Sequence, residues 1–185
     1  MSQPSSTLSL PPLALRPVRD TDTAQLLELN SAAVPAVNEL DADQLAAILS
    51  AAHSAIAIVA DAEPNSVLGF AILFAAGADY ASENYQWFSD RAEDFLYVDR
   101  IVVSAEHRGQ GLGAQLYSAV FDAARALSVD VVFCEVNLKP RNPESLAFHD
   151  RLGFTEIGQQ STKGDSVVVS LLSADVSEAR SAPPE

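Results

Sequence analysis

The pattern of hydrophobic and polar residues along the chain predicts alternating short strands and helices. Runs of apolar, partly β-branched residues predict strands, and apolar residues spaced three or four positions apart predict helices. The expected strands lie at residues 13–18, 54–60, 67–76, 95–103, 130–136, 154–160 and 166–172. The expected helices lie between the capping residues 20–22 and about residue 30, after residue 41, and at 111–127 and 142–152.

The polar segments between these elements carry turn and capping signals. A turn at residues 61–66 pairs the flanking strands as a hairpin, and Asp41 and Gln44 have the spacing of a helix capping box. Residues 77–93 are polar and aromatic, which predicts a long loop or irregular insert, either a functional lid or a surface excursion. We expect a flexible segment at residues 1–12 and a disordered tail at 173–185, because neither has a core pattern.

Length and composition indicate one domain. The chain has 185 residues, 48% hydrophobic and 19% charged, which is enough for one buried core that we place at residues 13–172. The lone Cys134 lies in an apolar run without a disulfide partner, which fits a buried structural thiol and a reducing cytoplasm. Because no segment resembles a secretion signal or a membrane span, we expect a cytoplasmic protein.

The charge balance limits the partners that the chain would attract. Eleven Lys and Arg residues stand against 25 Asp and Glu residues, for a formal net charge of −14. Such a charge repels nucleic acid and anionic membranes at long range and attracts cations. We therefore expect no nucleic acid and no membrane as a partner, and a cationic acceptor if the chain acts on a second molecule.

A glycine-rich loop is the clearest chemical signal. The strand at 95–103 leads into Arg108–Gly113, with the sequence RGQGLG, and a strong helical pattern begins at once. Glycine lets the backbone approach an anion, and a helix N-terminus adds roughly half a positive charge. Arg108 adds a full charge. The pattern indicates an anion site, with an ordinary turn between strand and helix as the alternative.

A dinucleotide-binding loop is a rival interpretation, since Gly109, Gly111 and Ala114 satisfy the relaxed G-x-G-x-x-G/A pattern. Such a domain needs several more strand–helix units, yet only 71 residues follow Ala114. No acidic residue closes a second strand about twenty positions on. The loop is not that of a P-loop protein either, because no Lys-Ser or Lys-Thr follows the glycines.

Two motifs, in order, resemble the signatures of the GCN5-related N-acetyltransferase (GNAT) superfamily. Residues 103–113 follow V-x-A-x-x-R-x-x-G-x-G, similar to its acetyl-CoA loop, with Ala105 where proline is usual. Residues 142–154 resemble its Asn-led helix that ends in Leu-Gly-Phe. The resemblance covers residues 13–172. It implies an α/β (α+β) fold with a mixed, V-splayed central sheet of about seven strands, flanked by about four helices.

The same resemblance implies acetyl-CoA as the acetyl donor and no metal. The pantetheine arm is expected between the strands at 95–103 and 130–136. Asn142 is expected to hold the pantetheine or pyrophosphate region, with a helix N-cap as its alternative role. Lys139 and Arg141 either approach the adenosine 3′-phosphate or are simply solvated. The expected cofactor-binding residues are Ile101, Val102, Val103, Arg108, Gly109, Gln110, Gly111, Leu112, Gly113, Ala114 and Asn142.

The superfamily's direct transfer needs a base for the acceptor ammonium and a proton for the leaving thiolate. Glu135 lies in an otherwise apolar strand, where desolvation would raise its pKa toward the range of a base; its alternative is a carboxylate at the strand rim. Members that acetylate N-terminal amines carry their proton acceptor at the matching position. His149 stands where many relatives have a proton-donating tyrosine, and its alternative is a surface or packing histidine. Cys134 lacks a basic neighbour and is a poor nucleophile.

Carboxylates of the insert and of the next strand predict where a cationic acceptor would bind. Asp99 is the sharpest candidate for an ammonium contact or a second base, with a salt bridge as its alternative role. The others are Asp79, Glu83, Asp90, Glu93 and Asp94, opposed by Arg91 and Arg100. We expect a monomer or homodimer that acetylates a polyamine-like small amine, or a protein N-terminal or lysine amine. The alternative is a CoA-binding regulatory or interaction module with reduced catalysis.

Overall fold

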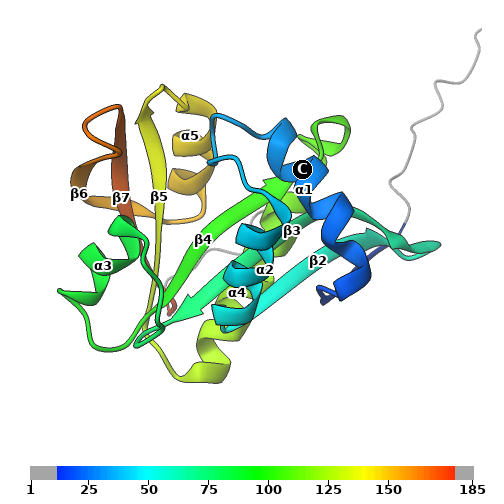
Figure 1. The fold of residues 1–185 in the computed structure, drawn as a ribbon. Helices are drawn as coiled ribbons and strands as arrows, with labels where there is room; N and C mark the ends of the chain where they lie inside the picture. Colours follow the sequence, from blue (N-terminus) through cyan, green and yellow to red (C-terminus); the bar gives the residue numbers. More distant parts are fainter. Residues whose placement is uncertain (1–11, 178–185) are drawn as a thin grey trace, which may run out of the picture.

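The computed structural model describes residues 12–177, which form one seven-stranded sheet with helices on both faces (Figure 1). The strand order is β1-β2-β3-β4-β5-β7-β6, and only β4 and β5 are parallel. The strands are β1 (Leu13–Pro17), β2 (Ser54–Ala60), β3 (Glu63–Ala75), β4 (Leu96–Val103), β5 (Val131–Lys139), β6 (Thr155–Thr162) and β7 (Val167–Asp175). The helices are α1 (Thr23–Ala32), α2 (Ala42–Ala51), α3 (Glu83–Ser89), α4 (Leu112–Leu127) and α5 (Pro143–Arg151), with 3-10 turns η1 (Asp20–Asp22) and η2 (Ala105–His107). The predicted mixed sheet is confirmed.

The sheet has a separate hydrophobic cluster on each face. Successive residues of a strand point to opposite faces, so Leu96 packs into the cluster under α4, whereas Tyr97 packs into the cluster under α1, α2 and α3. Cys134 and Val136 likewise face α4. Glu135 lies between them in the strand and therefore points to the other face, where α3 packs.

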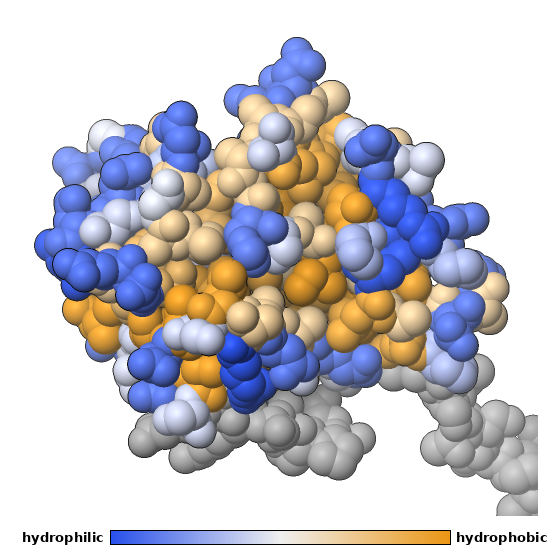
Figure 2. All heavy atoms as spheres, turned by 90° about the horizontal axis from the view of Figure 1, so that it is seen from below, coloured by the Kyte–Doolittle hydropathy of each residue, from blue (hydrophilic) through white to orange (hydrophobic). Residues whose placement is uncertain are grey.

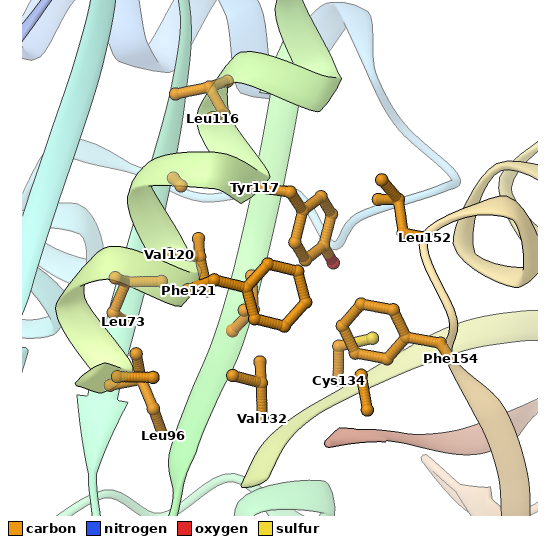
Figure 3. Packing of buried hydrophobic residues seen from close by; sticks show 14 of the residues in the cluster. Leu73, Leu96, Leu116, Tyr117, Val120, Phe121, Val132, Cys134, Leu152 and Phe154 are labelled. Atoms are coloured by element: carbon orange, nitrogen blue, oxygen red, sulfur yellow. The ribbon is translucent and has the colours of Figure 1, made fainter. Parts of the chain in front are cut away.

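Helix α4 shows how the sequence pattern becomes packing. Leu112, Leu116, Val120 and Ala124 recur every four residues and are buried against the sheet. Figure 3 shows Leu116 and Val120 among residues of β3, β4 and β5. With 16 residues, α4 is the longest helix in the described part of the chain. No helix there is both long and apolar enough to cross a membrane.

The two parallel strands separate after a short paired stretch. Leu96 and Tyr97 of β4 pair with Val132 and Phe133 of β5, and beyond them β4 pairs only with β3, while β5 pairs only with β7. The strands diverge toward the top of Figure 1. The end drawn in Figure 2 lies on the opposite side, and hydrophobic residues gather at its centre. The predicted splayed sheet is thus observed, and its split opens at the C-terminal ends of β4 and β5.

Several predicted boundaries differ from the structure, among them the end of β5, which continues to Lys139 instead of ending at residue 136. Residues 77–93 are not a plain loop, because they contain α3, which Ser82 caps and which buries Tyr85 and Phe88 in the core. The predicted turn at 61–66 is shorter, since β3 begins at Glu63. Strand β7 continues to Asp175, three residues into the predicted tail, because it pairs with β5 along that length. Residues 1–11 and 178–185 of the predicted terminal segments lie outside the described residues.

Candidate active site

The predicted glycine loop lies between β4 and the N-terminus of α4. Gly109 and Gly111 have φ angles of +71° and +78°, in the left-handed region that favours glycine, and Gly111 is the residue that caps α4. The backbone N–H groups of the first helical turn, at Leu112, Gly113 and Ala114, have no acceptor within the helix. They point out of the helix end together, which suits an anion.

Two neighbours shape this anion site. A Cβ atom at Gly113 would lie 3.1 Å from Cζ of Phe148, so glycine there lets the start of α4 approach α5 closely. Arg108 is exposed beside the loop, and Gln110 donates from Nε2 to the carbonyl oxygen of Glu106 (3.1 Å). The loop therefore combines converging backbone amides with one free guanidinium.

The end of β4 that borders the split has a free backbone edge. Ile101, Val102 and Val103 pair with β3 on one side, and no residue of β5 pairs with them on the other. Unpaired strand N–H and C=O groups need partners, and an extended chain of amides can supply them. Across the split, Asn142 caps α5, its Oδ1 accepting from the Ser145 amide (3.3 Å). The alternative role predicted for Asn142 is therefore observed.

One cavity of about 1800 Å³ occupies the split. This exceeds the roughly 300–1000 Å³ of an ordinary small-molecule site, so the cavity has room for two molecules. All the predicted cofactor-binding residues line it, and so do Asp99, Glu135 and His149. Neither Lys139 nor Arg141 lines it, which agrees with their predicted alternative of solvated charges.

Glu135 is the carboxylate at the centre of the split. The Tyr97 hydroxyl donates to its Oε2 (2.8 Å), and the Asn84 side chain of α3 is a second donor. Burial first, and then the negative charge of Asp99, raise the pKa of Glu135 from an ordinary 4.5 to about 8, against the opposing effects of the hydrogen bonds and of the charge of Arg100. A carboxyl that titrates near pH 8 can accept a proton from an amine.

Asp99 is the second carboxylate, placed on β4 at a bulge opposite Ile72 and Leu73. Its Oδ2 accepts from Nε of Arg100 (2.7 Å), and its Oδ1 accepts from the hydroxyl of Tyr80. The side chains of Arg100 and Asp99 are only 3% and 6% exposed. The salt bridge predicted as the alternative role of Asp99 is therefore present, and it occupies the carboxylate that a bound ammonium would contact.

The α1–α2 loop, residues 33–41, crosses the split and forms one wall of the cavity. Arg100 of β4 donates from Nη2 to Oδ1 of Asn38 (3.2 Å). Asn137 of β5 donates from Nδ2 to the carbonyl oxygen of Pro35 (2.9 Å). The loop is thus attached to both diverging strands, one attachment on each side of the opening (Figure 1).

His149 lies on the other face of β5, against α4. Its Nδ1 donates to the carbonyl oxygen of Ser145 (2.7 Å), so its Nε2 accepts from the hydroxyl of Tyr117 (2.7 Å). Burial lowers the pKa of His149 to about 4. The lowered pKa favours the neutral imidazole at neutral pH, and the buried contacts of His149 fit the alternative prediction of a packing histidine. Burial also raises the pKa of the Cys134 thiol, as befits a structural cysteine.

Several residues of the site were not predicted from the sequence. Tyr97 could have been, because a period of two places it on the same face of β4 as Asp99. Nothing in the spacing points to Tyr80 or Asn84, which come from the insert. Of the predicted acidic cluster only Glu83 and Asp99 line the cavity, and Asp79, Asp90, Glu93 and Asp94 do not. Within residues 12–177, no three His, Cys, Asp or Glu side chains are grouped to hold a metal ion.

The fold and the sequence of this chain were compared with those of known proteins. The fold is similar to that of the ribosomal-protein-S18-alanine N-acetyltransferase from Escherichia coli, with a TM-score of 0.66, 16% identity, and coverage of 91% of this chain and 96% of that chain. It is similar to yncA of Salmonella typhimurium, solved with its cofactor acetyl-CoA (TM-score 0.65, 20% identity, 93% and 98% coverage). It is also similar to Ard1 from Thermoplasma volcanium (TM-score 0.70, 15% identity, 88% and 97% coverage). No curated protein sequence matches the chain. The Acetyltransferase (GNAT) family profile matches residues 23–154, well over half of the chain and both sequence motifs, so this chain belongs to the GNAT acetyltransferase family.

Proposed function

We propose that this chain is an acetyl-CoA-dependent N-acetyltransferase that moves the acetyl group directly to an amine. The observation that carries the proposal is the Glu135 carboxyl, which stands in the split beside the free edge of β4 with its pKa raised to about 8. Membership of the GNAT family and the similarity to a fold solved with acetyl-CoA support the choice of donor.

The donor would occupy the half of the cavity next to α4. Its pyrophosphate would accept hydrogen bonds from the amides at residues 109–114, with the exposed Arg108 beside it. Its pantetheine amides would pair with the free edge of Ile101, Val102 and Val103, as an added strand does. Asn142 keeps its oxygen on the α5 cap, and its side-chain amide remains available to the donor.

In the proposed reaction the acceptor ammonium gives one proton to the Glu135 carboxylate, and the neutral amine nitrogen then attacks the thioester carbonyl carbon. The carbon–sulfur bond breaks, the electron pair goes to sulfur, and the nitrogen loses its second proton to solvent as the amide forms. A carboxylate with an ordinary pKa would be a poor base for this proton, and desolvation makes Glu135 a better one. His149 is neutral, and both of its ring nitrogens already form hydrogen bonds. We therefore propose that His149 positions Tyr117 and that the leaving thiolate takes its proton from solvent.

The acceptor would enter the half of the cavity on the α3 side. Besides Glu135 and the Asp99–Arg100 ion pair, the cavity is lined by Glu39 of the α1–α2 loop and Glu83 of α3. These two carboxylates would attract a protonated amine before it reaches the base. The proposed acceptor is an amine of a small molecule or of a protein. The Escherichia coli neighbour, named for the alanine of ribosomal protein S18, supports testing an N-terminal amine.

A direct assay tests the proposal. The protein is incubated with acetyl-CoA and, in turn, spermidine, lysine amide and an alanyl peptide, while thiol release and the mass of the amine are followed. We expect at least one amine to accelerate thiol release and to gain one acetyl group. Tight acetyl-CoA binding without acceleration by any amine would refute the enzyme and favour the CoA-binding module.

A further inference from the structure

Arg100 is a buried cation that contacts three separate parts of the acceptor side. Its Nε donates to Asp99 of β4, its Nη1 to Oδ1 of Asn30 in α1 (2.8 Å), and its Nη2 to Asn38 of the α1–α2 loop. Only 4% of the residue is exposed. A guanidinium is planar and presents its donors in a fixed fork, so these three contacts fix the relative positions of the three segments.

Stability alone is a weak reason for such a residue. Removing a charge from water is costly, and well-packed apolar residues are often as stable as a buried ion pair. Two of the three contacts of Arg100 are with features that border the acceptor half of the cavity, namely the loop across the split and the carboxylate beside Glu135.

We propose that Arg100 is a positioning residue for the acceptor: its guanidinium fixes the α1–α2 loop through Asn38 and holds the Asp99 carboxylate in an ion pair beside Glu135. The inference rests on the proposed acetyl transfer. Arg100 itself need not touch the acceptor. It fixes the position of the α1–α2 loop, against which the acceptor binds, and of the Asp99 carboxylate, whose charge acts on Glu135.

The groups around Glu135 make the second part testable. From β4 it faces Tyr97, Asp99 and Arg100, and from the insert it faces Tyr80 and Asn84. The nearby groups on the α4 side, Tyr117 and Cys134, are neutral, because burial raises both of their pKa values. Asp99 and Arg100 are the charged groups among the largest influences on the pKa of Glu135, and they act on it with opposite signs.

Three variants separate the loop contact from the charge. Asn38→Ala removes one loop contact from an exposed residue and leaves the Arg100–Asp99 pair intact. Arg100→Lys keeps the positive charge but loses the fork that reaches Asn38. Asp99→Asn removes the negative charge with little change of shape. Asn65→Ala is the matched control, because Asn65 is also exposed and also accepts from an arginine, Arg19, but lies outside the cavity.

The measurements are kcat and KM for the best amine of the panel, the Kd of acetyl-CoA, and the pH dependence of kcat/KM. We expect Asn38→Ala and Arg100→Lys to raise the amine KM by about 3- to 10-fold, the loss of one hydrogen bond, with the acetyl-CoA Kd and the pH profile unchanged. We expect Asp99→Asn to move the acidic limb of the profile about one pH unit lower, since the pKa of Glu135 falls when its negative neighbour is removed. Asn65→Ala should change none of these.

Two results would overturn the proposal. If Asn38→Ala and Arg100→Lys leave the amine KM within twofold of wild type, or weaken acetyl-CoA binding as much as amine binding, Arg100 does not position the acceptor. If Asp99→Asn leaves the acidic limb in place, Asp99 does not act on Glu135.

The proposed function can fail separately. If no amine of the panel is acetylated by the wild-type protein, the enzyme proposal fails. The role of Arg100 is then tested by hydrogen exchange and by the pH dependence of stability, which need no turnover. Asn38→Ala must then speed amide hydrogen exchange in residues 33–41. In Asp99→Asn, the loss of stability that follows the ionisation of Glu135 must be complete at a lower pH than in the wild-type protein. Unchanged exchange and an unchanged pH range would refute the role of Arg100 as well.

Discussion

Replacing Glu135 with glutamine tests the base through both stability and rate. Glutamine has nearly the same shape and cannot ionise. The pKa of Glu135 is raised from 4.5, its ordinary value, to about 8 in the folded protein. A pKa raised by folding means that the group contributes its full stability below pH 4.5 and loses it as the pH rises through 8.

The size of the effect follows from the same two values. They differ by about 3.5, and each pKa unit corresponds to about 1.4 kcal/mol, so ionising Glu135 in the folded protein costs about 5 kcal/mol. The wild-type protein should therefore lose about 5 kcal/mol between pH 4.5 and 8 through this group, and the Glu135→Gln variant should not. Other groups titrate alike in both proteins, so the difference between the two isolates Glu135.

The assay is urea unfolding of both proteins at pH values from 5 to 9. We expect the difference between the unfolding free energies, variant minus wild type, to increase as the pH rises, with most of the increase complete by about pH 8. In turnover, the variant should lose about 10²- to 10⁴-fold in kcat while its affinity for acetyl-CoA stays nearly the same.

A matched control is Glu156→Gln. Glu156 is an exposed carboxylate of β6 whose pKa is lowered by hydrogen bonds from Ser170 and Gln159, so its ionised form is favoured by folding. This variant should not gain stability relative to wild type at high pH. A constant stability difference between wild type and Glu135→Gln from pH 5 to 9 would refute a raised pKa, and an unaltered pH–rate profile would remove Glu135 as the base.

The remaining predictions concern the cofactor loop, the core and the buried histidine. Gly111→Asp should abolish acetyl-CoA binding in calorimetry, because it places a carboxylate at the anion site and a Cβ on a backbone with φ +78°; unchanged affinity would contradict the loop assignment. Leu116→Ala should lower the free energy of unfolding by about 2–5 kcal/mol in urea titration, because Leu116 is fully buried between α4 and the sheet; a loss under about 1 kcal/mol would contradict that packing. His149→Phe should slow turnover only modestly and leave the pH–rate profile unchanged, since the imidazole is already neutral; loss of a titration in the profile would restore His149 as a proton donor.

Short-range features of this protein could be predicted from its sequence because neighbouring residues decide them. The capping box of α2 needs only Asp41 and Gln44, which exchange hydrogen bonds of 2.8 and 3.0 Å. The glycine loop needs only glycines at positions with positive φ in front of a helical pattern. These local signals, together with the motif at residues 142–154, were enough to identify the fold and the family.

Helix α3 shows where local reasoning failed. Its seven residues include few strong helix formers, and its stability comes from the burial of Tyr85 and Phe88 against the sheet. A hydroxyl of Tyr85 also accepts from the amide of Ala78 and donates to the carbonyl oxygen of Ala75, which closes the insert onto β3. None of these contacts lies within a period that sequence patterns detect.

The sequence by itself determined the order of the elements apart from α3, the anion loop and an unusual carboxylate in an apolar strand. The tertiary structure decided what surrounds that carboxylate and what His149 does. The Tyr97–Glu135, Tyr117–His149 and Asn30–Arg100 contacts join residues 38, 32 and 70 positions apart. Burial and charge at such contacts depend on how strands and helices meet in space. Relative to solvated side chains, they raise the pKa of Glu135 and lower the pKa of His149.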